Sequence, residues 1–170
     1  MYGLPENLKL GKSWLEKANA QGSAEALFFL GTLELMDNSG KEFKKGFSLM
    51  EQSAEKGFVL AQSMVGNLYL DGASDFPKNT EKGLYWLNKA AEQDEPMALI
   101  RLSRVYLDGQ DGVPKDRMKG EKYLRRAASF DSAAQIDLGR RLLDGRGIAA
   151  DPTQAFSWHL KAAEQGGADG

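Results

Sequence analysis

The stretch AQSMVGNLYLDG, residues 61–72, contains the pattern that decides the fold. An alanine is followed four places later by an apolar residue, then directly by a small residue, and three places further on by Tyr69. The pattern returns every 35 to 37 residues, in copies that begin at Ala26, Ala98 and Ala134. One copy cannot bury its own apolar face, so a repeat of this size must stack on its neighbours.

A second segment accompanies each copy and reads GLYWLNKAAEQD in residues 83–94. Related segments occupy residues 11–22, 46–57, 120–131 and 155–166. One position holds a large residue in every copy, namely Trp14, Leu49, Trp86, Tyr123 and Trp158. Small pairs follow at Ala90/Ala91, Ala127/Ala128 and Ala162/Ala163. We expect the aromatic residues to lie in the core and the small pairs to let adjacent helices approach closely.

Capping residues predict where these second helices begin and end. Good N-cap residues stand four places before the start of four segments, at Asn7, Asn79, Asp116 and Asp151. Pro152 then falls at the first helical position, where its missing N–H costs nothing. The residues expected to end the helices are Gly22, Gly57 and Gly166, which suit the left-handed C′ conformation, and the less ideal Asp94 and Asp131.

The run A-x-x-x-L-G-x-x-Y, the D-G loop, the capped helix with Trp or Tyr and the ending A-A-x-x-G together resemble the Sel-like repeat (SLR) family, relatives of the tetratricopeptide repeats. The resemblance implies an all-α fold, a right-handed α/α superhelical solenoid of about four helix–turn–helix repeats plus a half repeat. It also implies a protein-binding scaffold without catalytic residues. The copy in residues 23–57 departs from the pattern, with Glu34 at the aromatic position and a shortened loop at residues 37–46.

We interpret residues 1–170 as a single array. The segments are a half repeat at 1–22, repeats at 23–57, 58–94, 95–131 and 132–166, and the start of a further repeat or a tail at 167–170. Residues 2–11 align without a gap on residues 111–120, inside a loop. We therefore expect a piece of a longer array whose exposed ends could self-associate, although a natural short protein with degraded end repeats stays open.

Composition favours a helical array that neither spans a membrane nor performs catalysis. The chain is 42% hydrophobic and 27% charged, and its apolar runs are far shorter than 18 residues. It contains no cysteine and a single histidine, His159, which we expect to be a partly exposed helix residue. Thiolate metal sites and Cys–His nucleophiles are therefore excluded, and we expect no metal, no cofactor and no enzyme activity. The compartment, cytoplasm or periplasm, stays open.

Charge is distributed unevenly, which suggests the partner. Residues 1–99 contain 10 Lys or Arg and 14 Asp or Glu, whereas residues 100–146 contain 11 and 7. If the first helix of each repeat lines a concave face, as in tetratricopeptide repeats, the candidate binding residues are Phe28, Thr32, Ser63, Asn67, Ile100, Arg101, Arg104, Ile136 and Arg140. Arginines among apolar side chains suit an acidic, partly apolar peptide or protein.

Alternatives remain for this face and for the function. Arg104 and Arg140 could instead pair within their own helices with Asp108, Asp137 or Asp144. A sequence pI near 5.5 argues against nucleic acid. Within the binding class, the alternative to a scaffold is a dedicated inhibitor or immunity protein that occludes one toxin or enzyme.

Overall fold

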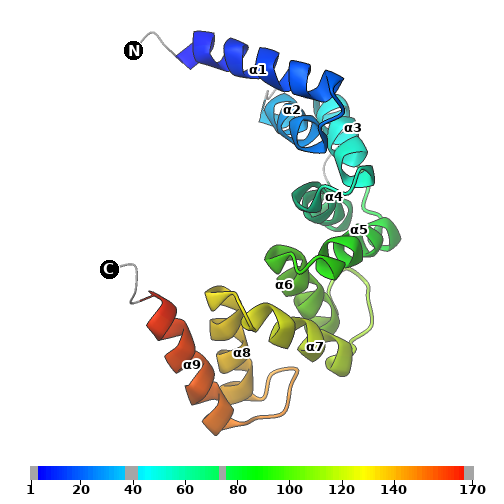
Figure 1. Ribbon diagram of the computed structural model, residues 1–170. Coiled ribbons are helices and arrows are strands. Elements are labelled where there is room, and N and C mark those ends of the chain that lie inside the picture. The colour runs from blue at the N-terminus through cyan, green and yellow to red at the C-terminus, as the bar shows by residue number, and fades with distance from the viewer. Residues whose placement is uncertain (1–3, 37–41, 73–75, 167–170) are drawn as a thin grey trace. The chain divides into compact units, whose positions relative to one another are not determined.

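The structure, a computed structural model, describes residues 4–36, 42–72 and 76–166, and the elements in them are helices (Figure 1). They are α1 (Leu4–Ala20), α2 (Ala24–Met36), α3 (Glu42–Glu55), α4 (Val59–Asp71), α5 (Thr80–Glu92), α6 (Pro96–Arg104), η1 (Val105–Gly109), α7 (Arg117–Ala128), α8 (Ser132–Asp144) and α9 (Pro152–Gly166). The element η1 is a π-helical turn that directly continues α6. The expected all-α class is confirmed.

The chain divides into two compact units, Met1–Val65 and Gly66–Gly170. In the first unit, α2 packs against both α1 and α3. In the second unit, α6 packs against α5 and α7, and α8 packs against α7 and α9. Within each unit, these helices therefore pack against neighbours along the chain, as expected of stacked repeats.

Small residues bring the two helices of a repeat into contact. In the first unit, a Cβ atom on Gly31 would lie 2.7 Å from the carbonyl oxygen of Gly46. In the second unit, a Cβ atom on Gly83 would lie 3.0 Å from the carbonyl oxygen of Gly66. A Cβ atom at these distances would press on the backbone of the facing helix, so glycine is required at these two positions for the helices to approach this closely.

A large side chain of the second helix packs beside each of these contacts. It is Met50 in α3 and Leu87 in α5, both fully buried, and Leu124 at the same repeat position of α7 is fully buried as well. In α9 His159 has this position. Its ring packs on Gly139, where a Cβ atom would lie 2.8 Å from His159 Nε2. His159 is half-buried, as expected, and its ring packs on the helix opposite.

Most predicted helix ends are confirmed. The side chains of Asn79, Asp116 and Asp151 each accept a hydrogen bond from the backbone N–H three residues later, at 2.9 to 3.0 Å. Pro152 is the first residue of α9. Gly22 and Gly57 are left-handed with φ near +90°, and Asp94 takes the same region with φ of 59°.

Two predicted caps are wrong. Asn7 lies inside α1, which begins at Leu4, because Pro5 fits a first helical turn where no N–H donor is needed. Asp131 does not end α7 but caps α8, since its carboxylate accepts a hydrogen bond of 2.7 Å from the backbone N–H of Ala134. The connection after Ala128 is one residue shorter than the one after Ala91, which moves Asp131 to the N-cap position.

The prediction that the repeated large residues lie in the core is also wrong. Trp14 is 62% exposed, and Leu49, Trp86, Tyr123 and Trp158 are only half-buried. The alanine pairs fill the interface instead, buried except for Ala163, and they hold the aromatic rings at its edge. At that edge the rings make polar contacts: the hydroxyl of Tyr123 donates to Asn88 Oδ1 at 2.6 Å, and Lys161 Nζ lies 5.1 Å from the Trp158 ring.

Gly120→Ala should destabilise the protein. The added methyl group would lie 2.9 Å from the backbone nitrogen of Leu107, so α7 must move, at a cost of about 1–3 kcal/mol. Gly11→Ala is the matched control, because Gly11 has the same repeat position in α1 and nothing within 4 Å. It should leave stability unchanged or raise it by about 0.5–1 kcal/mol. Urea denaturation midpoints measure both, and equal midpoints would contradict the close approach.

Candidate functional site

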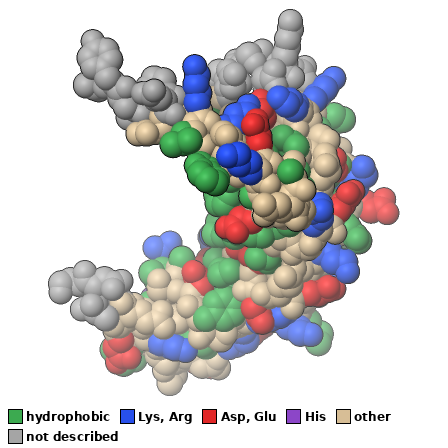
Figure 2. Space-filling model, turned by 45° about the horizontal axis from the view of Figure 1, so that its top comes forward, with side chains coloured by type: hydrophobic (Ala, Val, Ile, Leu, Met, Phe, Trp, Pro, Cys, Tyr) green, Lys and Arg blue, Asp and Glu red, His purple; other side chains and the backbone are tan. Residues whose placement is uncertain are grey.

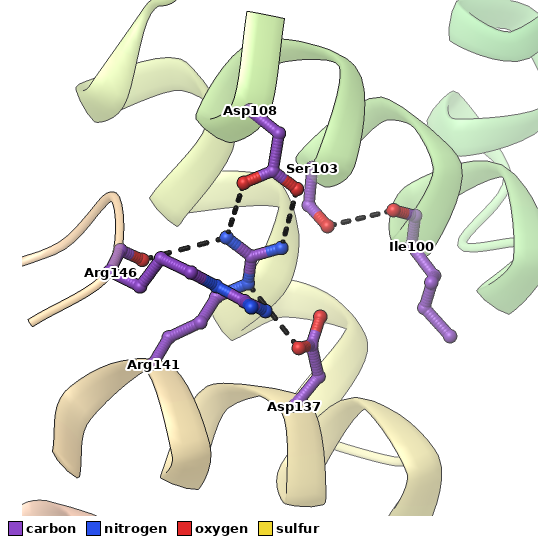
Figure 3. Close-up of polar contacts among 6 residues, drawn as sticks. All are labelled: Ile100, Ser103, Asp108, Asp137, Arg141 and Arg146. Atoms are coloured by element: carbon purple, nitrogen blue, oxygen red, sulfur yellow. Dashed lines mark hydrogen bonds and ion pairs between the residues drawn. The ribbon is translucent and has the colours of Figure 1, made fainter. Parts of the chain in front are cut away.

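A buried arginine is the centre of the polar contacts in the second unit (Figure 3). The side chain of Arg141, on α8, is 2% exposed. Its guanidinium donates to both carboxylate oxygens of Asp108 at 2.8 and 2.9 Å, and its Nε donates to Asp137 Oδ1 at 3.3 Å. A weaker contact of 3.5 Å reaches the carbonyl oxygen of Arg146. Arg141 therefore joins η1, α8 and the loop after α8.

These contacts change the protonation equilibria of both partners. The hydrogen bonds from Arg141 hold the pKa of Asp108 below its usual range, against the opposing effect of burial. The same hydrogen bonds raise the pKa of Arg141. Both groups therefore stay ionised, and the pair is two matched charges in a fork geometry.

The D-G loops owe their position to such arginines. Asp108 begins the D-G sequence after α6 and is held by Arg141 of the following repeat. Asp71 begins the one after α4 and accepts a hydrogen bond of 2.7 Å from Arg101, again from the following repeat. Arg101 also donates to Asp111 at 3.0 Å. Each arginine thus fixes a loop of the repeat before it.

A second contact recurs along the chain. The residue at the aromatic position in the first helix of a repeat pairs with a lysine in the second helix. Tyr69 accepts a hydrogen bond from Lys82 at 3.3 Å, and Tyr106 accepts one from Lys119 at 2.7 Å. The hydrogen bond to Tyr106 raises the pKa of Lys119. Each ammonium also lies over the ring of its tyrosine, at 5.1 and 4.2 Å from the centroid.

Glu34 occupies this position in the first unit and keeps the lysine partner. Lys45 precedes Gly46 as Lys82 precedes Gly83, and it donates to Glu34 Oε1 at 3.0 Å. Lys12 of α1 donates to the same oxygen at 2.9 Å. These two hydrogen bonds lower the pKa of Glu34 from 4.5 to about 2. The departure from the repeat pattern is therefore a change from a tyrosine–lysine contact to an ion pair.

The candidate binding residues fall into three groups by exposure. Arg104, Ile136 and Arg140 are exposed, all of them in the second unit. Arg101 and Asn67 are half-buried in that unit, and Thr32 is half-buried in the first unit. The side chains of Phe28, Ser63 and Ile100 are buried. Their partner-binding role stays a prediction, and the exposed residues are the ones that can reach a partner directly.

The pairing alternative for Arg104 and Arg140 finds no support in the described part of the chain. Both oxygens of Asp108 are bound by Arg141, and Asp137 also accepts from Arg141. No ion pair of Arg104 or Arg140 is found among residues 4–36, 42–72 and 76–166. Their exposed charges are left to solvent or to a partner.

Sequence reasoning missed exposed apolar residues on the same helices. Met97 of α6 is 62% exposed and Leu143 of α8 is 57% exposed. In the first unit the missed residues are Phe29, Met36, Leu60 and Met64. Figure 2 shows such apolar side chains interspersed with charged ones on the visible surface. Helical spacing could have found Met97, because it stands four and seven residues before Arg101 and Arg104 and so shares their face.

No group of three or more His, Cys, Asp or Glu residues that could hold a metal ion is found among the described residues. Across the same residues, no helix has the length and apolar character needed to cross a bilayer.

Paired helices, close contacts at small residues and ion pairs between successive repeats define a class of protein, the α/α repeat solenoids. Within that class, the model of the Sel1 repeat matches residues 1–23, 24–58, 59–95, 96–129 and 132–167. The chain belongs to the Sel1 repeat family. Proteins of this family generally act as scaffolds for protein–protein interaction.

Solved structures from bacteria are similar to the chain. One is c5321, a protective antigen present in uropathogenic Escherichia coli strains that displays an SLR fold, with 34% identity, a TM-score of 0.76, and coverage of 91% of this chain and 33% of that chain. A Sel1 repeat protein from Oxalobacter formigenes is 27% identical with a TM-score of 0.73, covering 92% and 68%. A third, from Klebsiella pneumoniae subsp. pneumoniae, shares the fold at 22% identity and a TM-score of 0.56, covering 91% and 77%.

The chain spans about a third of the length of the Escherichia coli antigen. A search of curated proteins finds no match. The expected solenoid class is confirmed by the family match and by these structures.

Arg141→Met should unfold the protein far more easily than Arg140→Met. Removing Arg141 leaves Asp108 and Asp137 without their shared cation, at a cost of about 3 kcal/mol or more. Arg140 is adjacent but exposed, so its substitution should stay within about 0.5 kcal/mol. Urea denaturation at neutral pH distinguishes the two, and similar midpoints would show that the Arg141 contacts contribute little.

Glu34→Gln should reveal a pH-dependent contribution to stability. Because the pKa of Glu34 is about 2 in the folded chain and 4.5 ordinarily, its stabilisation is complete above pH 4.5 and is lost as the pH falls toward 2. The variant should be less stable than the wild type by about 2 kcal/mol at pH 7, with the gap closing below pH 4.5. Denaturation midpoints across this range provide the test. Glu16→Gln, at an exposed position of α1, should follow the wild type throughout.

Proposed function

We propose that this chain is a non-catalytic scaffold or adaptor that binds an acidic, partly apolar segment of a partner protein. The proposed surface, called here the arginine face, consists of the exposed side chains Met97, Arg104, Ile136, Arg140 and Leu143 on α6 and α8. The proposal treats the repeats as a single array. It also includes the less exposed candidate residues, which would support or flank the exposed ones: Phe28, Thr32, Ser63, Asn67, Ile100 and Arg101.

The observation that carries this proposal is the contrast between arginines of the second unit. Arg125 and Arg126 bind Glu121 and Asp94 within the chain, and Arg141 binds Asp108. Arg104 and Arg140 make no such ion pair with the described residues. A guanidinium with its fork free can bind a carboxylate through two parallel hydrogen bonds.

The arrangement of the helices supports a joint role for these two arginines. Arg104 stands one turn before Asp108, and Arg140 precedes Arg141, the residue that binds Asp108 at 2.8 Å. The helix α7 packs against both α6 and α8. Arg104 and Arg140 have the same position in successive repeats, and the helices that carry them both pack against α7. Because these helices are already ordered, most of the entropy cost of binding falls on the partner.

Exposed apolar side chains give the surface a second type of contact. Ile136 stands one turn before Arg140, and Leu143 stands three residues after Arg140. The three side chains therefore lie along one side of α8. Apolar contacts beside charged pairs exclude water from them, which strengthens both. A partner segment with alternating acidic and apolar residues satisfies this chemistry.

Arg104→Glu/Arg140→Glu should abolish capture of the partner while helicity stays unchanged. Reversing both charges makes the face repel carboxylates. The test is affinity capture from a lysate of the source organism with mass spectrometry, together with circular dichroism. Lys44→Glu/Lys122→Glu changes the net charge equally at exposed positions outside the face and should retain capture.

Undiminished capture by the arginine variant would place binding on another face and overturn the proposal. The number of captured proteins separates the two modes of action. Several partners, all lost in the variant, would fit an adaptor. One dominant partner would fit a dedicated inhibitor or immunity protein that occludes a toxin or an enzyme.

A further inference from the structure

A pocket lies between the two loops that join the helices of the last two repeats, outside the arginine face. Its volume is about 270 Å³. It is lined in part by Asp108 at the end of α6 and η1, by Lys115 and Arg117 at the start of α7, and by residues 145–147 after α8. Loops from two successive repeats thus form one concave site within the second unit.

Three cationic side chains and one carboxylate line this pocket. The side chains of Lys115, Arg117 and Arg146 are exposed, and none makes an ion pair with a residue that the structure describes. Asp108 is the carboxylate that lines the pocket, and both of its oxygens are taken by Arg141. Arg141 is shared with Asp137, and Lys115 and Arg146 also contribute to lowering the pKa of Asp108. The three cations nevertheless outnumber the one carboxylate that lines the pocket.

The loops that line the pocket contact Leu107 and Arg141, which are buried in the second unit. Gly147 is left-handed, with φ of +78°, and a Cβ atom on it would lie 3.3 Å from Leu107 Cβ and 3.5 Å from Arg141 Nη1. Arg141 also donates weakly to the carbonyl oxygen of Arg146. On the other side, a Cβ atom on Gly109 would lie 2.9 Å from Lys115 Cγ, so the stem of Lys115 packs on the loop. Parts of both loops therefore pack against the rest of the second unit.

We propose that this pocket binds a phosphoryl group in its dianionic form, as a phosphomonoester. A single carboxylate would leave two of the three cations unmatched, whereas a dianion with three terminal oxygens can accept hydrogen bonds from two guanidinium forks and one ammonium. The pocket holds one such group and the first atoms of its ester. The source is a phosphorylated side chain of a protein or a small phosphate ester, and the chemistry recognised is the same.

The first test is a titration of the full chain with inorganic phosphate at constant ionic strength, followed by amide chemical shifts. Saturable shifts should appear at residues 108–117 and 145–147, with a dissociation constant of about 1 mM. Lys115→Gln/Arg146→Gln should weaken binding by about tenfold or more. Lys44→Gln/Lys122→Gln removes the same charge at exposed positions elsewhere and should bind as the wild type does.

Shifts spread over all exposed cations, or equal weakening in both variants, would show diffuse attraction and overturn the proposal. So would acetate binding as tightly as phosphate, because the site then does not need a dianion. A phosphoserine peptide and glycerol phosphate distinguish the sources: tighter binding of the peptide indicates a protein, and equal binding indicates a small ester. Since Arg104 and Arg140 are untouched in every variant, failure here leaves the arginine face unaffected.

Discussion

The close approach of two small residues in each helix pair is the constraint on which the rest of the structure depends. Gly31 meets Gly46, and Gly66 meets Gly83, at distances that leave no room for a side chain. Because the backbones are so near, the large side chain beside each contact is buried completely. Where Ser103 replaces glycine, its hydroxyl donates to the carbonyl oxygen of Ile100 at 2.7 Å, so the buried polar group is satisfied within its own helix.

Polar contacts on top of this framework differ from repeat to repeat without altering it. Tyrosine and lysine pair in two repeats, and glutamate and lysine pair in the first unit. In the last repeat Leu142 stands at the aromatic position and Gln154 at the lysine position. The two positions therefore change together, because a buried polar group requires a partner and an apolar one does not.

The same principle separates structural from functional charge in the second unit. Arg141 and Arg101 hold the loops of the preceding repeats, and substituting them would alter the framework. Exposed cations without a partner in the described chain cost nothing to the fold and are available for recognition. Five of them are Arg104 and Arg140 on the arginine face and Lys115, Arg117 and Arg146 at the pocket between the loops.

The sequence by itself determined the period, the helix caps at Asn79, Asp116 and Asp151, and the positions of the small pairs, because capping and helical spacing depend on neighbours within a few residues. Only the tertiary structure decided that Arg141 is buried and Arg140 exposed, since the choice depends on Asp108, 33 residues away. It also decided that Ile100 is buried while Ile136, at the same repeat position, is exposed, and that Trp14 lies at the surface. One residue turns a helix by about 100°, so a small rotation against the next helix decides which side chain faces the core.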